Sequence, residues 1–174
     1  MRGRTAATTV ELARAGDEAA FAQLVATHHA DMARVAYVVC ADRGLAEDAV
    51  QSAWLVAWRK LGSLRDPDRV RPWLLSVTAN EARQILRRRH GPAMEIRVDV
   101  AGDARSDPSD RVERLDLRRA LARLSPDDRT LLAMHYAADL GSDELGAAVG
   151  VSPSAARKRL SRAIDRLKKE LRDG

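Results

Sequence analysis

The chain has 174 residues, of which 45% are hydrophobic and only 3% aromatic, and it carries a formal net charge of +5. This length allows one large domain or two small ones, and cores built from Leu, Val and Ala suit helices. A single cysteine, Cys40, excludes a disulfide within the chain and fits a reducing compartment. No apolar run approaches the roughly 20 residues that span a bilayer, and the first residues lack the apolar core of a signal peptide. We therefore expect a cytoplasmic protein that does not insert into a membrane.

The predicted fold is all-α, because no segment shows the alternating pattern of a strand. Several helix starts are marked by a capping Asp or Ser before a proline, which fits the first helical position. These pairs are Asp66-Pro67, Asp107-Pro108, Ser125-Pro126 and Ser152-Pro153. Asp127 and Asp128 then place negative charge where the helix dipole favours it. Helices are expected at about 17–40, 45–61, 70–90, 109–124, 126–138, 142–149 and 153–172.

A segment without helical periodicity separates the third and fourth of these helices. It reads GPAMEIRVDVAGDARSD over residues 91–107, and it is rich in Gly, Ala, Asp and Pro. Such a composition favours a flexible linker. The sequence therefore predicts two small helical domains, at 1–90 and 109–174, joined by a linker at 91–108.

The positive charge of the chain is concentrated in its last predicted helix. Residues 153–174 contain eight Lys or Arg and three Asp or Glu, while the rest of the chain is balanced. A helical projection centred on Leu160 places Ala156, Ala163, Ile164, Leu167 and Leu171 on one apolar face. Arg162 falls on the opposite face with other charged residues. One face is expected to pack, and the basic face suggests a polyanionic partner.

The residues before this helix match a helix-turn-helix. Gly146 permits a close crossing of two helices, and Gly150 can take the positive φ of a tight turn. The second helix of such a motif enters the major groove with its N-terminus first. Base edges are then expected near Ser152, Ser154, Arg157 and Lys158, and phosphates near Arg159, Arg162 and Arg166. The alternative is an ordinary helical hairpin with a solvated charged face.

The C-terminal sequence LSPDDRTLLAMHYAADLGSDELGAAVGVSPSAARKRLSRAIDRLKKEL resembles the DNA-binding domain of bacterial RNA polymerase sigma factors. It is most similar to the short extracytoplasmic-function (ECF) group, whose Lys-Ser-Arg-Leu-x-Arg-Ala run is matched here at Arg159, Leu160, Arg162 and Ala163. The segments AEDAVQSAWLVAW (46–58) and RPWLLSVTANEARQILRRR (71–89) resemble the polymerase-binding and promoter-melting helices of the same family. Departures from the family pattern at 154–156, Gly146 and Gln84 leave the promoter sequence open.

The resemblance implies roles for the two N-terminal helices. Contacts to core polymerase are implied for Asp48, Gln51, Trp54, Leu55 and Trp58. Contacts to a single-stranded −10 element are implied for Trp73, Asn80, Arg83, Arg87 and Arg88, with a flipped base held by the loop at 62–69. The alternatives are that the two tryptophans belong to the core and that the terminal arginines only complement the helix dipole. The linker is implied to run towards the RNA exit path, although a simple tether explains its composition equally well.

The expected function is therefore that of a sigma factor, which binds core RNA polymerase and recognises −10 and −35 promoter elements. The family also implies an anti-sigma factor as a partner. We expect no enzymatic activity, small-molecule substrate, cofactor or metal, because no zinc spacing, phosphate-binding loop or nucleophile triad is present. His28 and His29 are adjacent in a helix and point about 100° apart. Three alternatives are a free-standing helix-turn-helix regulator, a nucleic-acid-processing enzyme and an anti-sigma-like adaptor.

Overall fold

The computed structural model describes residues 2–90 and 108–173, with side chains described at 8–89 and 115–173. Within these ranges every regular element is a helix, so the predicted all-α class is confirmed. The α-helices are α1 (Arg2–Arg14), α2 (Glu18–Cys40), α3 (Arg43–Lys60), α4 (Val70–His90), α5 (Pro108–Arg123), α6 (Pro126–Leu132), α7 (Ser142–Val149) and α8 (Pro153–Asp173). The predicted linker lies outside the described residues, apart from Pro108 at the start of α5.

Short elements account for the differences from the sequence-based helices. Helix α1 and the two 3₁₀ helices, η1 (Leu61–Ser63) and η2 (Pro67–Arg69), were not predicted. The helix expected at 126–138 is α6 followed by a π-helical turn, η3 (Ala133–Ala137). That turn ends where Asp139 takes a φ of 53° and the Leu140 N–H donates to the Met134 carbonyl. Such a backbone reversal has no periodic signal in the sequence.

The capping residues act as predicted where their surroundings are described. The Ser125 side chain accepts a hydrogen bond from the Asp128 N–H at 3.1 Å. Ser152 Oγ accepts one from the Ala155 N–H at 3.3 Å, at the start of α8. Each satisfies a backbone donor that the first turn of a helix leaves free. Asp66 caps η2, which leads directly into α4. Asp107 lies outside the described residues.

The N-terminal domain, α1–α4, is a bundle in which α2, α3 and α4 pack against one another. Its core includes Met32, Ala49, Leu74 and Leu86, each fully or almost fully buried. Alanines on the inner face of α3 let the helices approach closely without large side chains. Helix α1 covers one end of α2, and its Val10 is also fully buried. This bundle holds the outer faces of α3 and α4 in fixed positions.

The C-terminal domain, α5–α8, contains the predicted helix-turn-helix in α7 and α8. A Cβ on Gly146 would lie 2.8 Å from the Val151 carbonyl oxygen, which confirms that this position requires a very small residue. Gly150 ends α7 with a φ of 70°, as its place in the turn predicted. On α8, Ala156 and Ala163 are fully buried, but Leu171 is 44% exposed. The prediction that Leu171 belongs to the packed face is therefore wrong, because α8 extends beyond the helices that cover it.

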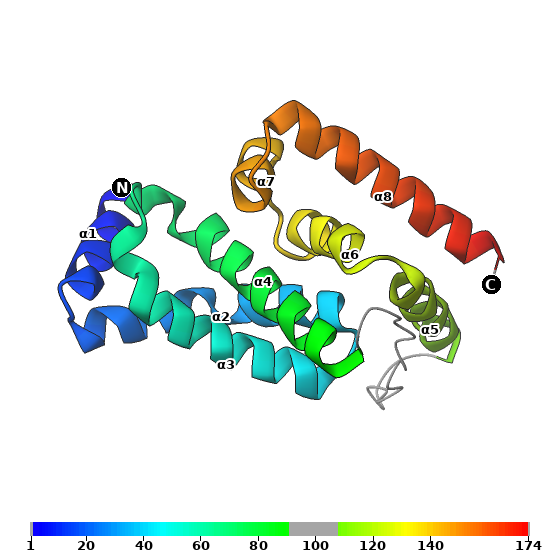
Figure 1. Ribbon diagram of the computed structural model, residues 1–174, viewed down its shortest axis with the longest axis horizontal. Helices are drawn as coiled ribbons and strands as arrows, with labels where there is room; N and C mark the ends of the chain where they lie inside the picture. The colour runs from blue at the N-terminus through cyan, green and yellow to red at the C-terminus, as the bar shows by residue number, and fades with distance from the viewer. Residues whose placement is uncertain (1, 91–107, 174) are drawn as a thin grey trace.

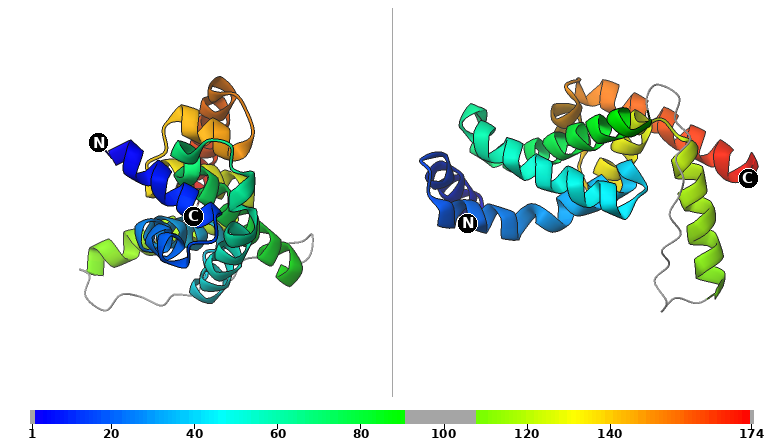
Figure 2. Two further views of the ribbon diagram at one scale, coloured as in Figure 1. Left: turned by 90° about the vertical axis from the view of Figure 1, so that its left-hand side faces the viewer. Right: turned by 60° about the horizontal axis from the view of Figure 1, so that its bottom comes forward.

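The two domains pack against each other and share one hydrophobic core. Figures 1 and 2 show α6 and α7 lying against the α2–α4 bundle, with α8 on the side of α6 and α7 that faces away from it. Met134 and Leu140 are buried in the same apolar cluster as the residues of α2 and α4. Arg34 on α2 donates to the Ala137 carbonyl at 3.3 Å, and Arg71 on α4 donates to the Ala138 carbonyl. The sequence predicted two tethered modules and gave no sign of this contact.

Within the described ranges, no helix is both long enough and apolar enough to cross a membrane.

Candidate nucleic-acid interface

The outer face of α3 is open to solvent. Asp48, Gln51, Leu55 and Trp58 are all exposed there, with Leu55 at 59% and Trp58 at 44%. Large apolar side chains exposed beside polar ones are typical of protein-binding surfaces. The Trp58 ring meets Phe21 edge to face, with 4.8 Å between the ring centroids, so it is held in place while one side stays accessible.

Trp54 has a different environment from its neighbours on α3. It is half-buried, and its ring also meets Phe21 edge to face at a centroid distance of 5.6 Å. Its indole N–H donates to His29 Nδ1 at 3.3 Å. A half-buried ring with its polar atom paired inside the domain is suited to supporting Trp58 and Leu55. The sequence left open whether Trp54 belongs to the core or to the polymerase-binding face. In the structure it contributes to both, because it is half-buried.

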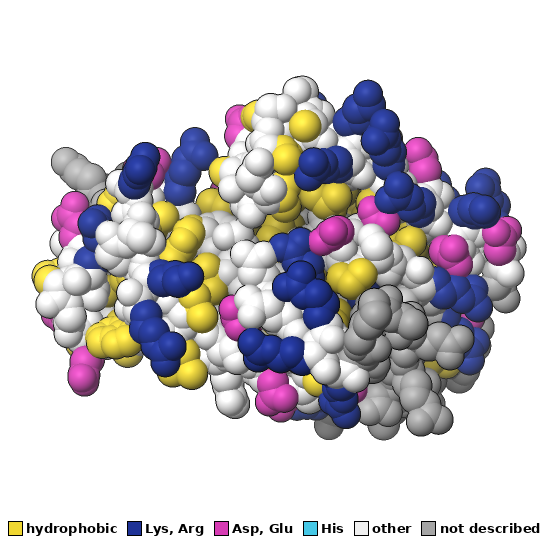
Figure 3. All heavy atoms as spheres, in the orientation of Figure 1, with side chains coloured by type: hydrophobic (Ala, Val, Ile, Leu, Met, Phe, Trp, Pro, Cys, Tyr) yellow, Lys and Arg dark blue, Asp and Glu magenta, His cyan; other side chains and the backbone are white. Residues whose placement is uncertain are grey.

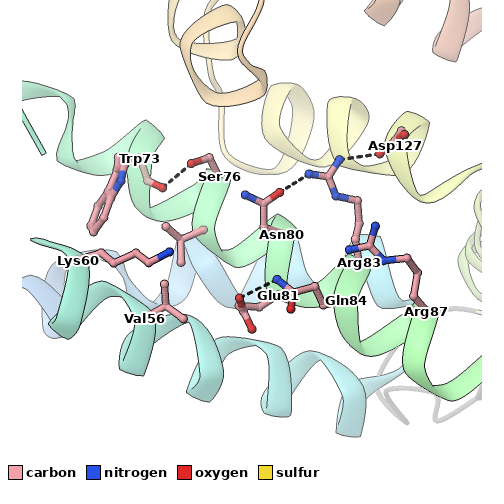
Figure 4. Close-up of a pocket in the computed structure, with 11 residues that line it drawn as sticks. Val56, Lys60, Trp73, Ser76, Asn80, Glu81, Arg83, Gln84, Arg87 and Asp127 are labelled. Carbon is pink, nitrogen blue, oxygen red and sulfur yellow. Dashed lines mark hydrogen bonds and ion pairs between the residues drawn. The ribbon is translucent and has the colours of Figure 1, made fainter. Parts of the chain in front are cut away.

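A groove runs along α4, with a volume of about 570 Å³. Figure 4 shows Trp73, Asn80 and Arg87 lining it from α4, with Lys60 reaching in from α3. Four of the five residues predicted to bind a −10 element line this groove, and Arg88 is exposed near the end of the helix. Amide, guanidinium and indole groups in one groove can pair with base edges, hold phosphates and stack on bases. Lys60 was not predicted, because it belongs to the neighbouring helix.

The basic face of α8 points into solvent. Exposed side chains on it include every residue predicted to contact a −35 element: Ser152, Ser154, Arg157, Lys158, Arg159, Arg162 and Arg166. Ser152 Oγ and Ser154 Oγ lie 3.1 Å apart at the N-terminus of α8, the end that enters the major groove in a helix-turn-helix. The apolar side of α8 packs on α5, α6 and α7, so its basic side is the one left to meet a ligand.

Two arginines of these surfaces are paired with carboxylates at the start of α6. Arg83 Nη1 on α4 donates to Asp127 Oδ1 at 2.6 Å, and Arg83 also donates to Asn80. Arg166 Nη1 on α8 donates to both carboxylate oxygens of Asp128 at 2.7 Å. Figure 3 shows acidic side chains between the basic side chains over α4 and those over α8. The sequence indicated only a helix-dipole role for the two aspartates, and no local pattern could reveal partners 44 and 38 residues away.

A second groove, of about 600 Å³, lies between α4 and α8. Arg159 and Arg162 line it together with Arg83, Asn80 and Asp127. Among the ion pairs of the described residues, none involves Arg159 or Arg162. This groove therefore joins the −10 and −35 candidate surfaces, and Asn80, Arg83 and Asp127 line both grooves.

The contact between α2 and α6 contains a buried arginine that lacks a carboxylate partner. Arg129 is fully buried, and among the described residues only its Nη1 atom has a partner, the Ala122 carbonyl at 3.4 Å. Burial lowers the pKa of the Arg129 guanidinium to about 10. Burial also raises the pKa of the neighbouring Cys40 thiol to about 12, against the opposing effect of the Arg129 charge. Burying a guanidinium without a carboxylate partner costs free energy, so the burial of Arg129 opposes the packing of α6 against α2.

Within the part of the chain that the structure describes, the side chains that could bind a metal are not gathered at one site. Among the described residues, no three His, Cys, Asp or Glu side chains lie together in a way that could hold a metal ion. His28 lies beside Arg71 and Asp31, and burial followed by the Arg71 charge lowers its pKa. His29 is exposed and accepts the Trp54 hydrogen bond.

Comparison with known proteins gives the same division of the chain. Residues 24–91 match the family model of sigma-70 region 2, and residues 114–167 match that of sigma-70 region 4. Together these two models cover more than half of the sequence. Region 2 thus coincides with α2–α4, and region 4 with most of the C-terminal domain.

Individual relatives extend the match over nearly the whole chain. The sigma factor CarQ of Myxococcus xanthus is 34% identical over 93% of this chain and 95% of its own length. The probable sigma factor RfaY of Xanthomonas campestris is 32% identical over 91% of this chain, which spans 42% of that relative. The structure of CnrH in complex with the cytosolic domain of CnrY matches with a TM-score of 0.73, 25% identity and 97% of each chain covered. The chain therefore belongs to the sigma-70 family of RNA polymerase sigma factors, within its ECF group.

Proposed function

We propose that this chain binds core RNA polymerase and directs it to start transcription at specific promoters. The observation that carries the proposal is the pairing of an exposed apolar face on α3 with a polar, cationic groove on α4, on the two helices of one rigid bundle. Region 2 of the family covers both helices. A free-standing regulator needs the helix-turn-helix alone, and the match to region 2 disfavours that reading.

The functional division of the chain follows these surfaces. Residues 1–90 form the domain for core polymerase and the −10 element, residues 109–174 form the domain for the −35 element, and 91–108 connect them. In this proposal, Leu55 and Trp58 are the apolar anchors on polymerase, supported by Trp54. Asp48 and Gln51 lie at the polar edge of the same face, where charges favour specificity over affinity.

The DNA contacts divide by chemistry. On α4, Asn80 and Trp73 are placed to bind exposed bases, while Arg83, Arg87 and Arg88 hold the backbone of the single strand. On α8, the N-terminal residues Ser152, Ser154, Arg157 and Lys158 meet base edges. Arg159, Arg162 and Arg166 meet phosphates, which position the helix without specifying sequence.

The same proposal covers partners and location. Sigma factors are initiation factors, and we propose that this chain carries out no bond-making step of its own and acts in the cytoplasm with the polymerase. CnrH is seen with the cytosolic domain of CnrY, and we propose that the present chain also binds a partner protein, an anti-sigma factor. The exposed faces of α3 and α8 are candidate binding sites for that partner.

Run-off transcription tests the proposed function directly. Purified core polymerase is combined with the full chain on a library of genomic fragments, and discrete transcripts are measured. We expect transcripts from a small set of fragments that share two short elements. Core polymerase alone is the control. Transcript levels equal to that control on every fragment would contradict the proposal.

A further inference from the structure

An acidic pair at the start of α6 engages one arginine from each candidate DNA-binding helix. Asp127 accepts from Arg83 of α4 at 2.6 Å, and Asp128 accepts from Arg166 of α8 with both carboxylate oxygens at 2.7 Å. The two aspartates are adjacent in sequence, so a single turn of helix bridges both surfaces. Guanidinium groups bind carboxylates and phosphates with the same planar geometry, and an aspartate can therefore occupy the place of a phosphate.

The position of Asp127 matters as much as its charge. It lines both the groove along α4 and the groove between α4 and α8, and it pairs with Arg83, which also donates to Asn80 of its own helix (Figure 4). A single strand of DNA that used Arg83 as a phosphate contact would have to displace the Asp127 carboxylate of α6. Arg83 is 30% exposed in this arrangement, whereas Arg87 and Arg88 at the end of α4 are open to solvent.

The acidic pair is held in place by the packing of the two domains. Leu131 and Met134, just after it in sequence, are buried in the shared core. Arg71 bridges Asp31 of α2 at 2.9 Å and the Ala138 carbonyl of the C-terminal domain. Arg118 of α5 donates to the Tyr37 hydroxyl of α2 and lies 5.4 Å from the centre of its ring. These contacts fix α6 against the bundle without any partner chain.

We propose that Asp127 and Asp128 act as intramolecular substitutes for promoter phosphates, and that Asp127, through its ion pair with Arg83, helps to hold the free chain in a closed, self-inhibited arrangement. The claim that the closed arrangement inhibits the chain rests on the proposed function. The closed arrangement itself does not depend on that function. In the closed chain, the Arg83 guanidinium of α4 is occupied by a carboxylate of α6, and the polymerase-binding face of α3 remains free. Opening requires that α6 moves away from α4, which frees the Arg83 guanidinium beside the exposed Asn80.

The closed arrangement carries a built-in opposing cost. Arg129, next to Asp128, is fully buried against Cys40 of α2 with its Nε and Nη2 atoms unpaired. Opening the domains hydrates this guanidinium and recovers part of its desolvation cost. The ion pairs and shared core favour closure, while Arg129 favours opening. Such a balance keeps the closed chain responsive to a partner that binds α3.

Cys40 provides a native probe of closure. It is the only cysteine in the chain and is fully buried in the closed arrangement. Its thiol lies close enough to Arg129 of the C-terminal domain to feel that charge. Labelling with a thiol reagent therefore reports the fraction of time in which the domains separate, because a buried thiol with a raised pKa reacts slowly.

The test compares the labelling rate of Cys40 in three full-length chains, without DNA or polymerase. Asp127→Asn removes one charge at the contact with little change in shape. Asp165→Asn removes the same charge from the exposed face of α8 and serves as the control. We expect Asp127→Asn to label about two- to fivefold faster than the unaltered chain, the range for a partly exposed ion pair. Asp165→Asn should label at the unaltered rate.

A charge swap separates the ion pair from general effects of charge. Arg83→Asp with Asp127→Arg restores the attraction in reverse, and we expect it to label more slowly than Asp127→Asn alone. Helical content measured by circular dichroism confirms that every variant is folded. Unaltered labelling in Asp127→Asn, or a swap that labels as fast as the single variant, would overturn the proposal. Because no DNA or polymerase is present, that result would leave the sigma-factor function untouched, and run-off transcription tests that function separately.

Discussion

Helices α3 and α4 belong to the same bundle, but their outer faces differ in accessibility. Leu55 and Trp58 on α3 are exposed, while Arg83 on α4 forms an ion pair with Asp127 of α6 in the C-terminal domain and also donates to Asn80 of its own helix. The proposed polymerase-binding face is thus open in the free chain, whereas Arg83 of the proposed DNA-binding face is already paired with the C-terminal domain. The difference indicates an order of events in which polymerase binds first and promoter DNA gains access afterwards.

The largest expected effect concerns the open face of α3. Leu55→Glu places a charge at an exposed apolar anchor, and we expect affinity for core polymerase to fall by about a hundredfold, in the range of interface hot spots. Leu12→Glu, at a leucine of α1 that is 48% exposed, is the matched control and should leave affinity unchanged. Fluorescence anisotropy of the labelled chain with core polymerase measures both. Equal affinities for the two variants would remove α3 from the polymerase contact.

Arg129 tests the contact between α2 and α6, which joins the two domains. Arg129→Met keeps most of the volume and removes the buried, unpaired guanidinium, so we expect the free energy of unfolding to rise by about 1–2 kcal/mol. Urea denaturation followed by circular dichroism measures the change. Arg123→Met is the control, since Arg123 pairs with Glu170 at the surface at 3.8 Å and its replacement should change stability by less than about 0.5 kcal/mol. A loss of stability in Arg129→Met would show that the guanidinium is satisfied in the folded chain.

The sequence predicted the helices far better than it predicted this contact. Helix α8 has a local apolar repeat with a capping serine, and α7 ends at a glycine, so both follow from neighbouring residues. Helix α1 has no such signal, because its helical state depends on packing of Val10 against the bundle. The partner of Arg83 lies 44 residues away and beyond an irregular segment, so periodicity and capping carry no information about it.

The candidate site, too, could be predicted only where its residues lie on one helix. The side chains that α3, α4 and α8 present to solvent could be identified from helical spacing and from the family resemblance. Lys60 and Asp127 enter the groove along α4 from other helices, and only the fold brings them there. The residues proposed to bind polymerase and DNA were therefore accessible to sequence reasoning, whereas the residues that other helices bring beside them were not.

A smaller effect is expected on the free face of α8. Arg162→Glu should weaken promoter binding by about tenfold and reduce the slope of log affinity against log salt by about one phosphate contact. Lys168→Glu makes the same change nearer the C-terminal end of α8 and should alter the slope less. Titrations at several salt concentrations, with polymerase present, provide the slopes. An unchanged slope in Arg162→Glu would remove this residue from the phosphate contacts.

The smallest effect concerns pH. Burial and then the Arg71 charge lower the pKa of His28, while Asp31 opposes them. As pH falls below about 6.5, the unfolded chain takes up this proton first, so the free energy of unfolding should decrease from pH 7.5 to 5.5. His28→Gln should show a smaller decrease, measured by urea denaturation at both pH values. An identical decrease in the two chains would assign the pH dependence to other groups.

The central claim is that α6 must leave α4 before the chain can function with polymerase on DNA. Cysteines at positions 34 and 137, introduced as Arg34→Cys and Ala137→Cys with Cys40→Ala, lie across the domain contact and outside both binding faces. A reducible bis-maleimide crosslinker between them should preserve core polymerase binding and abolish run-off transcription, and reduction should restore transcription to the level of the uncrosslinked variant. Transcription by the crosslinked chain at that same level would contradict the account.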